Sequence, residues 1–360
     1  MIPFLKPNLP PWEDVVVELK DAYESGRFHP GQYTERFEKA AAAQLGVKYA
    51  ALTSTASDAL ILQAAFSPNK SKLIAVPAFT FRATPQAVDW AGKNCLIVDV
   101  DDSGNMDPAE LDKAIRSYNS EVEAVMPVHV FGLPCNHDAL QQAANGRPIY
   151  YDAAHALGSR IEKKSVACLG DSAIFSLNIT KAIPSCGEGG LVATDSDEID
   201  SYFRQARWHG DVPGSLDWKM PGMNAKPTEW QAIVAYHALH YESKIIAARN
   251  VLADSYLSFL EGVQFVKPMQ SVPIGFTSAW KDFAVRFETV SNRKRAEENL
   301  KNAGIEYKRY FSPIVSEMEY FNGVIYSDDN ARRLAETVLC LPMHLKLTVD
   351  DQRLVIACLR

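Results

Sequence analysis

The chain has 360 residues, 47% hydrophobic and 22% charged, which is the composition of an ordinary folded protein. Its formal net charge of −7 argues against a nucleic-acid-binding protein, because there is no extended basic stretch to displace phosphate counterions. No apolar run approaches the roughly 20 residues that cross a bilayer, and the N-terminus lacks a secretory signal pattern, so we expect a cytoplasmic protein with no membrane partner.

The first half of the chain alternates between two kinds of pattern. Residues up to about 46 predict two helices, split by the segment 26–31 with a glycine at each end. From about residue 50 to 200, short apolar runs that indicate strands alternate with amphipathic stretches that indicate helices. The predicted strands are residues 73–79, 95–99, 124–131, 149–153, 173–178 and 191–194. Such alternation predicts a mostly parallel sheet covered by helices on both faces.

The pattern changes after Pro227. A long helix is predicted from Thr228 to about Gly262, and it would join two parts of the molecule. It is followed by a predicted strand at 279–287, a helix at 293–303, a strand at 305–310 and helices at 329–339 and 349–359. We therefore predict a large domain of residues 1–240 and a smaller C-terminal α+β domain of residues 241–360.

The cysteines indicate neither a disulfide framework nor a metal centre. They are scattered, with no C-x-x-C pair and no metal-ligand spacing, so we expect mostly buried thiols and no metal. These residues are Cys95, Cys135, Cys168, Cys186, Cys340 and Cys358.

Asp152 ends a predicted strand, in a segment that reads Tyr-Asp-Ala-Ala-His-Ala over residues 151–156. Open parallel sheets bind ligands at the carboxyl ends of their strands, which makes this carboxylate a candidate ligand group. Asp is also a good helix N-cap, and the motif taken alone favours that structural role.

Lys181 follows a predicted strand and precedes the glycine-rich segment 187–190, which reads Gly-Glu-Gly-Gly. Glycines let the backbone approach a ligand closely or adopt positive φ angles. Its apolar neighbours Ile179 and Ile183 favour desolvation of the amine, which would lower its pKa as Schiff-base chemistry requires. An isolated lysine is otherwise a solvated surface residue.

Two further segments complete the set. Residues 53–58 read Thr-Ser-Thr-Ala-Ser-Asp directly before an apolar helix, whose free N–H groups and positive dipole end suit a phosphate; a helix cap with nothing bound is the alternative. Phe81 follows a predicted strand and could stack on a planar ring, although a lone aromatic is more often core. Together a lysine, a carboxylate, a phosphate cradle and an aromatic cover are what a pyridoxal phosphate site requires.

In the order and spacing of these motifs, the chain resembles the DegT/DnrJ/EryC1/StrS sugar aminotransferases, fold-type-I pyridoxal phosphate enzymes acting on nucleotide-linked keto-sugars. The resemblance runs nearly end to end, from Gly31 to the Leu-Pro-Met-His segment at 341–344, and is most specific over residues 170–190. It implies an α/β fold of the fold-type-I class. A mostly parallel seven-stranded sheet would form the large domain, beside the smaller C-terminal α+β domain.

The resemblance also implies roles for the residues around the cofactor ring. Lys181 would form the Schiff base and shuttle the proton, so that Lys181 and Asp152 are the expected catalytic residues. Asp152 would pair with the pyridinium nitrogen, His155 would lie against the ring near its 3-oxygen, and Phe81 would stack on it.

At the phosphate, the resemblance assigns the side chain of Ser176 and the backbone of Ala56 and Ser57. This chain has Thr-Ala-Ser at 55–57 where the family often has Ser-Gly-Thr, and we expect the cradle to survive because the hydroxyl remains. Asn224 resembles the residue that reaches the phosphate from the neighbouring subunit. The active unit is therefore expected to be a homodimer with shared active sites.

Candidate substrate contacts come from loops that resemble the sugar-binding segments of the family. Lys226 stands where the family commonly has Arg, and we leave open whether it binds the nucleotide diphosphate or is a surface lysine. The candidates are His29, Lys226, Arg309, Tyr310 and His344.

The activity that the resemblance implies is transfer of an amino group from glutamate to a nucleotide-linked keto-deoxysugar, at C3 or C4, in O-antigen or other polysaccharide biosynthesis. Alternatives are an aminotransferase acting on a cyclitol or another non-nucleotide ketone, or a non-catalytic ligand-binding or regulatory relative. Relatives that dehydrate sugars carry His in place of the lysine, and Lys181 argues against that reaction.

Overall fold

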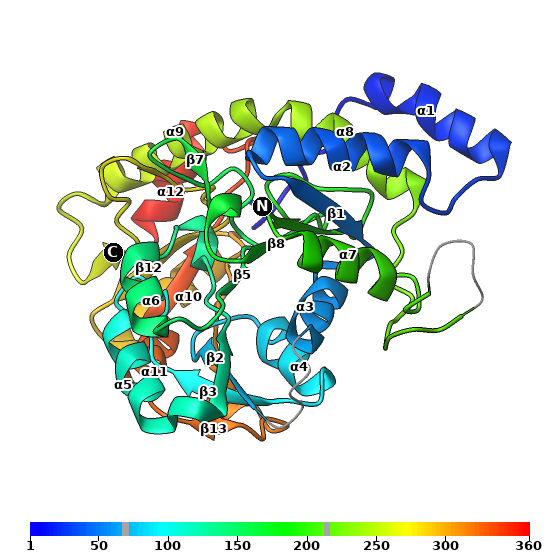
Figure 1. The fold of residues 1–360 in the computed structure, drawn as a ribbon. Helices are drawn as coiled ribbons and strands as arrows, with labels where there is room; N and C mark the ends of the chain where they lie inside the picture. Colours follow the sequence, from blue (N-terminus) through cyan, green and yellow to red (C-terminus); the bar gives the residue numbers. More distant parts are fainter. Residues whose placement is uncertain (67–71, 212–216) are drawn as a thin grey trace.

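The computed structural model describes residues 1–66, 72–211 and 217–360. A large sheet with helices on both faces adjoins a smaller sheet with helices of its own (Figure 1). Within the described part of the chain, no helix combines the length and the apolar character needed to cross a membrane.

The large sheet consists of two four-stranded parts, with strand orders β1-β9-β8-β5 and β13-β3-β2-β4. Parallel bridges between Val125 and Ile149 and between Val128 and Asp152 join β4 to β5, so the two parts continue into each other. β9 runs antiparallel to β1 and β8, and the other paired strands are parallel. The strands are β1 (Tyr49–Thr53), β2 (Leu73–Pro77), β3 (Asn94–Val98), β4 (Val122–Val125), β5 (Tyr150–Asp152), β8 (Ser172–Ser176), β9 (Gly190–Thr194) and β13 (Val324–Ile325).

The predicted mostly parallel seven-stranded sheet is confirmed, with the two-residue strand β13 added at its edge from the C-terminal part of the chain. Side chains along each strand alternate between two cores because successive residues point to opposite faces. In β2, Leu73 and Ala75 enter one core, whereas Ile74 and Val76 enter the other.

Helices cover both faces of this sheet. One core takes the buried sides of α2 (Gln32–Leu45), α5 (Pro108–Tyr118), α6 (His137–Ala144) and α8 (Glu229–His240). The other takes those of α3 (Ala56–Ala65), α4 (Ala83–Trp90), α7 (Asp197–Ala206) and α11 (Asp329–Thr337). α1 (Trp12–Ser25) lies on α8, and the predicted split between the two N-terminal helices is confirmed.

The smaller sheet has the order β10-β12-β14 and is antiparallel. With its helices it forms a separate core. Its elements are α9 (Glu242–Leu260), β10 (Val266–Pro268), β12 (Phe283–Phe287), α10 (Val290–Asn302), β14 (Val338–Leu341) and α12 (Val349–Ala357). A third, short sheet has the order β11-β6-β7, formed by β6 (Arg160–Ile161), β7 (Lys164–Ser165) and β11 (Phe276–Thr277).

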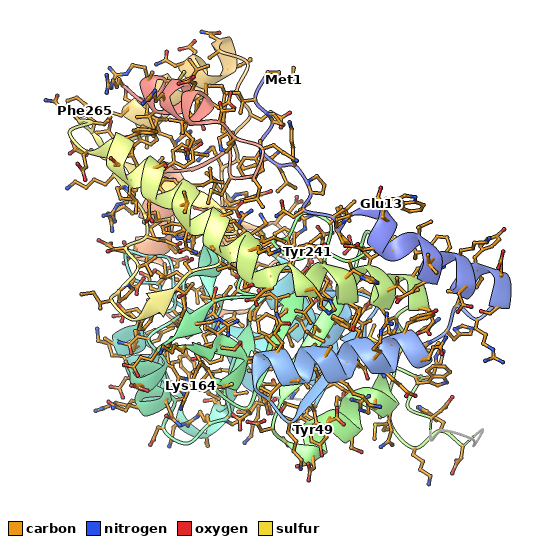
Figure 2. The ribbon with its side chains drawn as sticks, turned by 90° about the horizontal axis from the view of Figure 1, so that it is seen from above. Met1, Glu13, Tyr49, Lys164, Tyr241 and Phe265 are labelled. Atoms are coloured by element: carbon orange, nitrogen blue, oxygen red, sulfur yellow. The ribbon has the colours of Figure 1, made fainter. Side chains whose placement is uncertain are left out.

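Two predicted elements of the C-terminal part are wrong. The single helix predicted from 228 to 262 is two helices, α8 and α9, which meet at Tyr241 (Figure 2). α8 packs into the core of the large sheet, whereas α9 begins in that core at Ile245 and Ile246 and enters the small core from Ala253 to Leu260. The strand predicted at 305–310 makes only isolated bridges, from Ile305 to Ile2 and from Lys308 to Cys340.

The break at Tyr241 supports a division of the chain into domains near residue 240, which we propose as the boundary. Each of the two parts also contributes a segment that pairs with the other part. Ile2 pairs with Ile305 of the C-terminal part, while β13 joins the edge of the large sheet by pairing with β3.

Candidate active site

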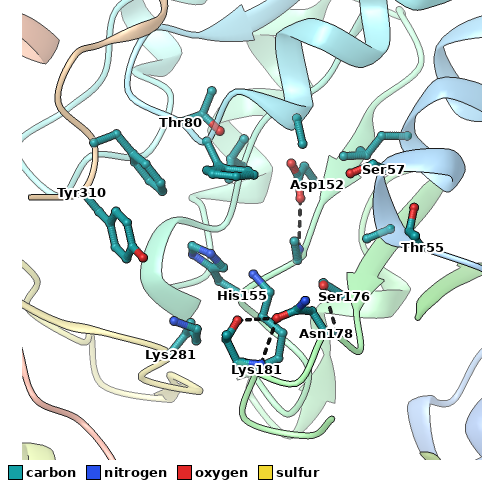
Figure 3. A pocket seen from close by; sticks show the side chains of 18 of the residues that line it. Thr55, Ser57, Thr80, Asp152, His155, Ser176, Asn178, Lys181, Lys281 and Tyr310 are labelled. Atoms are coloured by element: carbon teal, nitrogen blue, oxygen red, sulfur yellow. Dashed lines mark hydrogen bonds between the residues drawn. The ribbon is translucent and has the colours of Figure 1, made fainter. Parts of the chain in front are cut away.

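A cavity of about 310 Å³ opens at the carboxyl ends of β5 and β8 (Figure 3). These two strands end at Asp152 and Ser176, so the sheet itself delivers both side chains to the same place. The predicted site residues that line the cavity are Ala56, Ser57, Phe81, Asp152, His155, Ser176, Lys181 and Tyr310.

Lys181 sits in a tight turn after β8. Its backbone N–H donates to Asn178 O at 2.8 Å, and the Asn178 side chain donates to Glu188 Oε1 at 2.5 Å. The turn is thereby tied to the glycine-rich segment that follows it. Burial, followed by the nearby positive charge of Lys281, lowers the pKa of Lys181 to about 7. A large fraction of the amine is therefore uncharged and nucleophilic near neutral pH.

This lowered pKa gives a testable pH dependence. Protein stripped of cofactor should capture pyridoxal phosphate at a rate that rises with pH through about 7, because only the uncharged amine attacks the aldehyde. Stopped-flow absorbance measures that rate, with N-acetyl-lysine methylamide as the reference amine. A midpoint near 10.5, the ordinary value for lysine, would contradict the desolvated environment.

Asp152 is buried and receives hydrogen bonds from neutral donors. Thr84 Oγ1 donates to its Oδ2 at 2.7 Å, and the Ala154 N–H donates to its Oδ1 at 3.0 Å. Burial raises the pKa of this carboxyl, and only the more distant charge of Lys181 opposes it among the cations of the described chain. A protonated ring nitrogen in the cavity would supply the missing positive charge, so the carboxyl fits the expected cofactor.

The alternative role of Asp152 as a helix cap is wrong. The residues that follow it, 153–156, form a turn, and no helix begins there.

The first turn of α3 forms one end of the cavity. Thr55 caps this helix by accepting the Asp58 N–H at 3.0 Å, and Ala56 and Ser57 follow it. Gly190 of β9 allows this arrangement, since a Cβ there would lie 2.4 Å from Thr55 O and 2.6 Å from Ala56 N. The glycine-rich segment thus lets the sheet pass directly against the N-terminus of α3, where backbone N–H groups favour an anion.

Aromatic rings form another wall of the cavity. Phe81 is 45% exposed, which leaves a ring face free to cover a planar ligand. His155 stacks on Phe311 with ring centroids 6.2 Å apart and an interplanar angle of 17°. Its Nδ1 accepts the Phe131 N–H at 3.2 Å, and burial lowers the pKa of its imidazole well below the usual value. The ring is therefore neutral, with its proton on Nε2.

Several residues of the cavity were not found from the sequence. Asn178 and Glu188 lie inside the motif around Lys181 but have no signal of their own. Thr84, which does not line the cavity, donates to Asp152 and was not predicted either. Lys281 lines the cavity from the C-terminal part of the chain, and no motif accompanies it.

Two predicted substrate contacts lie outside the cavity and have packing partners instead. Arg309 donates to Ala335 O at 3.0 Å and to Ser312 Oγ at 3.1 Å. His344 is 2% exposed, and its Nε2 lies 3.2 Å from Pro3 O. We propose that both residues hold the small domain together rather than touch sugar.

The remaining predicted residues gather around Trp208, away from the cavity of their own chain. The His29 ring lies 6.1 Å from the Trp208 ring, and Lys226 Nζ lies 4.7 Å from the Trp208 centroid. Asn224 pairs with Trp208 through a backbone bridge. We call His29, Trp208, Asn224 and Lys226 the Trp208 cluster.

Known proteins share both the sequence pattern and the fold. The profile of the DegT/DnrJ/EryC1/StrS aminotransferase family matches residues 13–360. The chain is 29% identical to dTDP-4-amino-4,6-dideoxy-D-glucose transaminase of Shigella dysenteriae, over 99% of this chain and 97% of that protein. It is 31% identical to GDP-perosamine synthase of Caulobacter vibrioides, over 91% and 90% of the two chains.

Among solved structures, DesI in the presence of its TDP-sugar product aligns with a TM-score of 0.89 and 29% identity, covering 98% of this chain and 90% of that one. A family match over nearly the whole chain, relatives aligned from end to end and a cavity that fits the cofactor agree with one another. The chain is a pyridoxal-phosphate-dependent aminotransferase and belongs to the DegT/DnrJ/EryC1/StrS family.

Proposed function

We propose that this aminotransferase moves an amino group from glutamate to C3 or C4 of a nucleotide-linked keto-deoxysugar. The observation that carries the proposal is one cavity that joins Lys181, Asp152 and the N-terminus of α3. The substrate class is supported by the relatives, whose names specify amino sugars linked to dTDP and GDP. We further infer that the reaction takes place in the cytoplasm and serves O-antigen or other polysaccharide biosynthesis.

Different residues of the cavity would hold different parts of the cofactor. Pyridoxal phosphate, when bound, supplies an electron sink for charge that develops at the substrate carbon. Asp152 holds the proton on the ring nitrogen, because a buried carboxylate beside a cation favours the charged pair. The first turn of α3, at Ala56 and Ser57, and the hydroxyl of Ser176 bind the phosphate. Phe81 and His155, which both line the cavity, would hold the ring by contact with their own rings.

Lys181 carries the proton. Its uncharged amine would take the proton from the donor α-carbon in one half-reaction and deliver a proton to the sugar carbon in the other. A pKa of about 7 suits both directions, since a base is most effective when its pKa lies near the working pH. One base serving two half-reactions at one site predicts ping-pong kinetics.

We infer that the active unit is a homodimer in which the Trp208 cluster covers the cavity of the other subunit. In support, none of the four residues of the cluster lines the cavity of its own chain. The Ser54 N–H donates to Ala225 O at 2.9 Å and fixes the cluster's segment beside the loop before α3. Asn224 then reaches the partner's phosphate site, and His29 and Lys226 face its nucleotide. Sedimentation equilibrium that gave the mass of a single chain would contradict this assembly.

The proposed substrate class is tested with a panel of compounds. Purified protein loaded with pyridoxal phosphate is incubated with glutamate and with 3-keto and 4-keto sugar nucleotides, keto-cyclitols and free keto-sugars. Mass spectrometry then detects the gain of an amino group, and Lys181→Ala protein serves as the blank. We expect amination of at least one sugar nucleotide and formation of 2-oxoglutarate.

Two outcomes of the panel would favour other functions. Amination of the cyclitols or free sugars alone would indicate that the substrate is a non-nucleotide ketone. Protein that stays colourless after incubation with pyridoxal phosphate would instead support a binding or regulatory role.

A further inference from the structure

A second lysine, Lys281, reaches the cavity from the segment before β12 (Figure 3). The residue is only 5% exposed, and its ammonium donates to Asp282 Oδ1 at 2.9 Å. In Figure 3, Lys281 and Tyr310 lie on the side opposite to Thr55 and Ser57, so this cation is separate from the phosphate cradle. Among the charged groups that act on Lys181, Lys281 has the largest effect on its pKa.

The backbone that carries Lys281 is held in place by a buried arginine. Arg249 of α9 is 1% exposed and donates to Lys281 O at 2.8 Å and to Trp280 O at 2.6 Å. The Lys281 N–H also donates to Phe131 O at 2.8 Å. Burying a guanidinium against carbonyl groups is costly, and burial lowers the pKa of Arg249 to about 10. We read Arg249 as a positioning residue for this segment.

The Lys281–Asp282 pair is incomplete as a structural ion pair. Asp282 is 1% exposed, and its Oδ2 has no hydrogen-bond partner in the part of the chain that the structure describes. An ammonium has three donors, and Asp282 Oδ1 is the acceptor found for it here. A buried pair stabilises a fold only when its remaining groups are satisfied. Lys281 therefore has donors available for a ligand in the cavity.

We propose that Lys281 binds the α-carboxylate of the amino donor. The inference rests on the proposed function, because it takes glutamate as that donor. The donor nitrogen replaces Lys181 Nζ, and its carboxylate is attached to the same carbon as that nitrogen. Lys281 lines the same cavity as Lys181 and can therefore meet this carboxylate. A keto-sugar brings hydroxyl groups and no carboxylate to that position, so Lys281 serves the donor half-reaction.

The test is a binding cycle on the cofactor-loaded enzyme. 2-Methylglutamate has no α-proton and binds without being consumed, while 4-aminobutyrate lacks the α-carboxylate of glutamate. Titrations followed by the cofactor absorbance give a Kd for each ligand with wild type, Lys281→Met, Lys281→Gln and Lys281→Arg. Lys267→Met, an exposed lysine of β10, is the control for loss of one positive charge.

We expect Lys281→Met and Lys281→Gln to raise the Kd for 2-methylglutamate at least tenfold, Lys281→Arg to restore most of the affinity, and Lys267→Met to change nothing. The Kd for 4-aminobutyrate should stay within twofold in all variants, which a general distortion of the site would not allow. If either neutral variant binds cofactor but changes the Kd for 2-methylglutamate less than twofold, the inference is overturned and the proposed function stands. Wild type that forms no cofactor band would overturn the proposed function as well.

Should Lys281→Met fail to fold because Asp282 loses its partner, Lys281→Gln still decides the matter, since its amide can donate to Asp282.

Discussion

Lys181→Ala protein is expected to show no measurable amino transfer and no absorbance band from cofactor joined to the chain. The substitution removes both the covalent attachment and the group that moves the proton. Loss of positioned acid–base catalysis alone costs about 10²- to 10⁴-fold in rate. The measurement is 2-oxoglutarate formation from glutamate, together with an absorbance spectrum of the protein after gel filtration.

The matched control is Lys164→Ala, at an exposed lysine of β7 outside the cavity, which should keep wild-type turnover. Circular dichroism should show that both variants are folded. Full activity of Lys181→Ala would contradict the assignment of Lys181 as the residue that binds the cofactor and moves the proton. It would leave the fold unaffected, because the assignment depends on one side chain and the fold on its two extended cores.

Asp152→Asn protein is expected to keep its cofactor and lose most of its turnover. A neutral amide can keep both contacts, because its oxygen accepts the Ala154 N–H and its NH2 donates to the Thr84 hydroxyl, so the local structure should survive. It cannot hold a proton on the ring nitrogen by charge, and an unprotonated ring is a poor electron sink. We expect kcat to fall by about 10²-fold or more, in the range by which one preorganised electrostatic contact acts. The KM for glutamate should change much less.

Asp99→Asn is the matched control for loss of a buried carboxylate. Asp99 is 7% exposed and accepts the Asn330 N–H at 2.7 Å and the Ala331 N–H at 2.9 Å, far from the cavity lining. This variant should lose stability in a thermal melt and keep its turnover per folded site. Near-normal turnover of Asp152→Asn would leave Asp152 with a purely structural role.

Much of the site follows from local sequence. Short segments of sequence encode each of its local features, which are the strand ends at Asp152 and Ser176, the turn with Lys181 and the first turn of α3. A parallel sheet brings strand ends to one edge, so a correct reading of strands and helices already places these groups together. The continuous apolar runs of β2 and β3 likewise predict a sheet covered on both faces.

Other features have no local signature. Arg309 and His344 matched their motifs but point into packing contacts, because the direction of a loop side chain depends on the elements around it. The helix pattern over 228–262 continues through Tyr241, and nothing in it marks the break between α8, which stays in the large core, and α9, which runs from the large core into the small one.

The sequence by itself determined the family and the cofactor and predicted Lys181 as the central residue, because Lys181 and its neighbours form one short, ordered pattern. Only the tertiary structure decided which distant residues surround that lysine in the cavity. Lys281 lies 100 positions further along the chain and enters the cavity because Arg249 and Phe131 hold its backbone there. Contacts of this kind arise from packing between distant elements. The periodicity of a sequence predicts one helix or strand at a time, so it cannot predict such contacts.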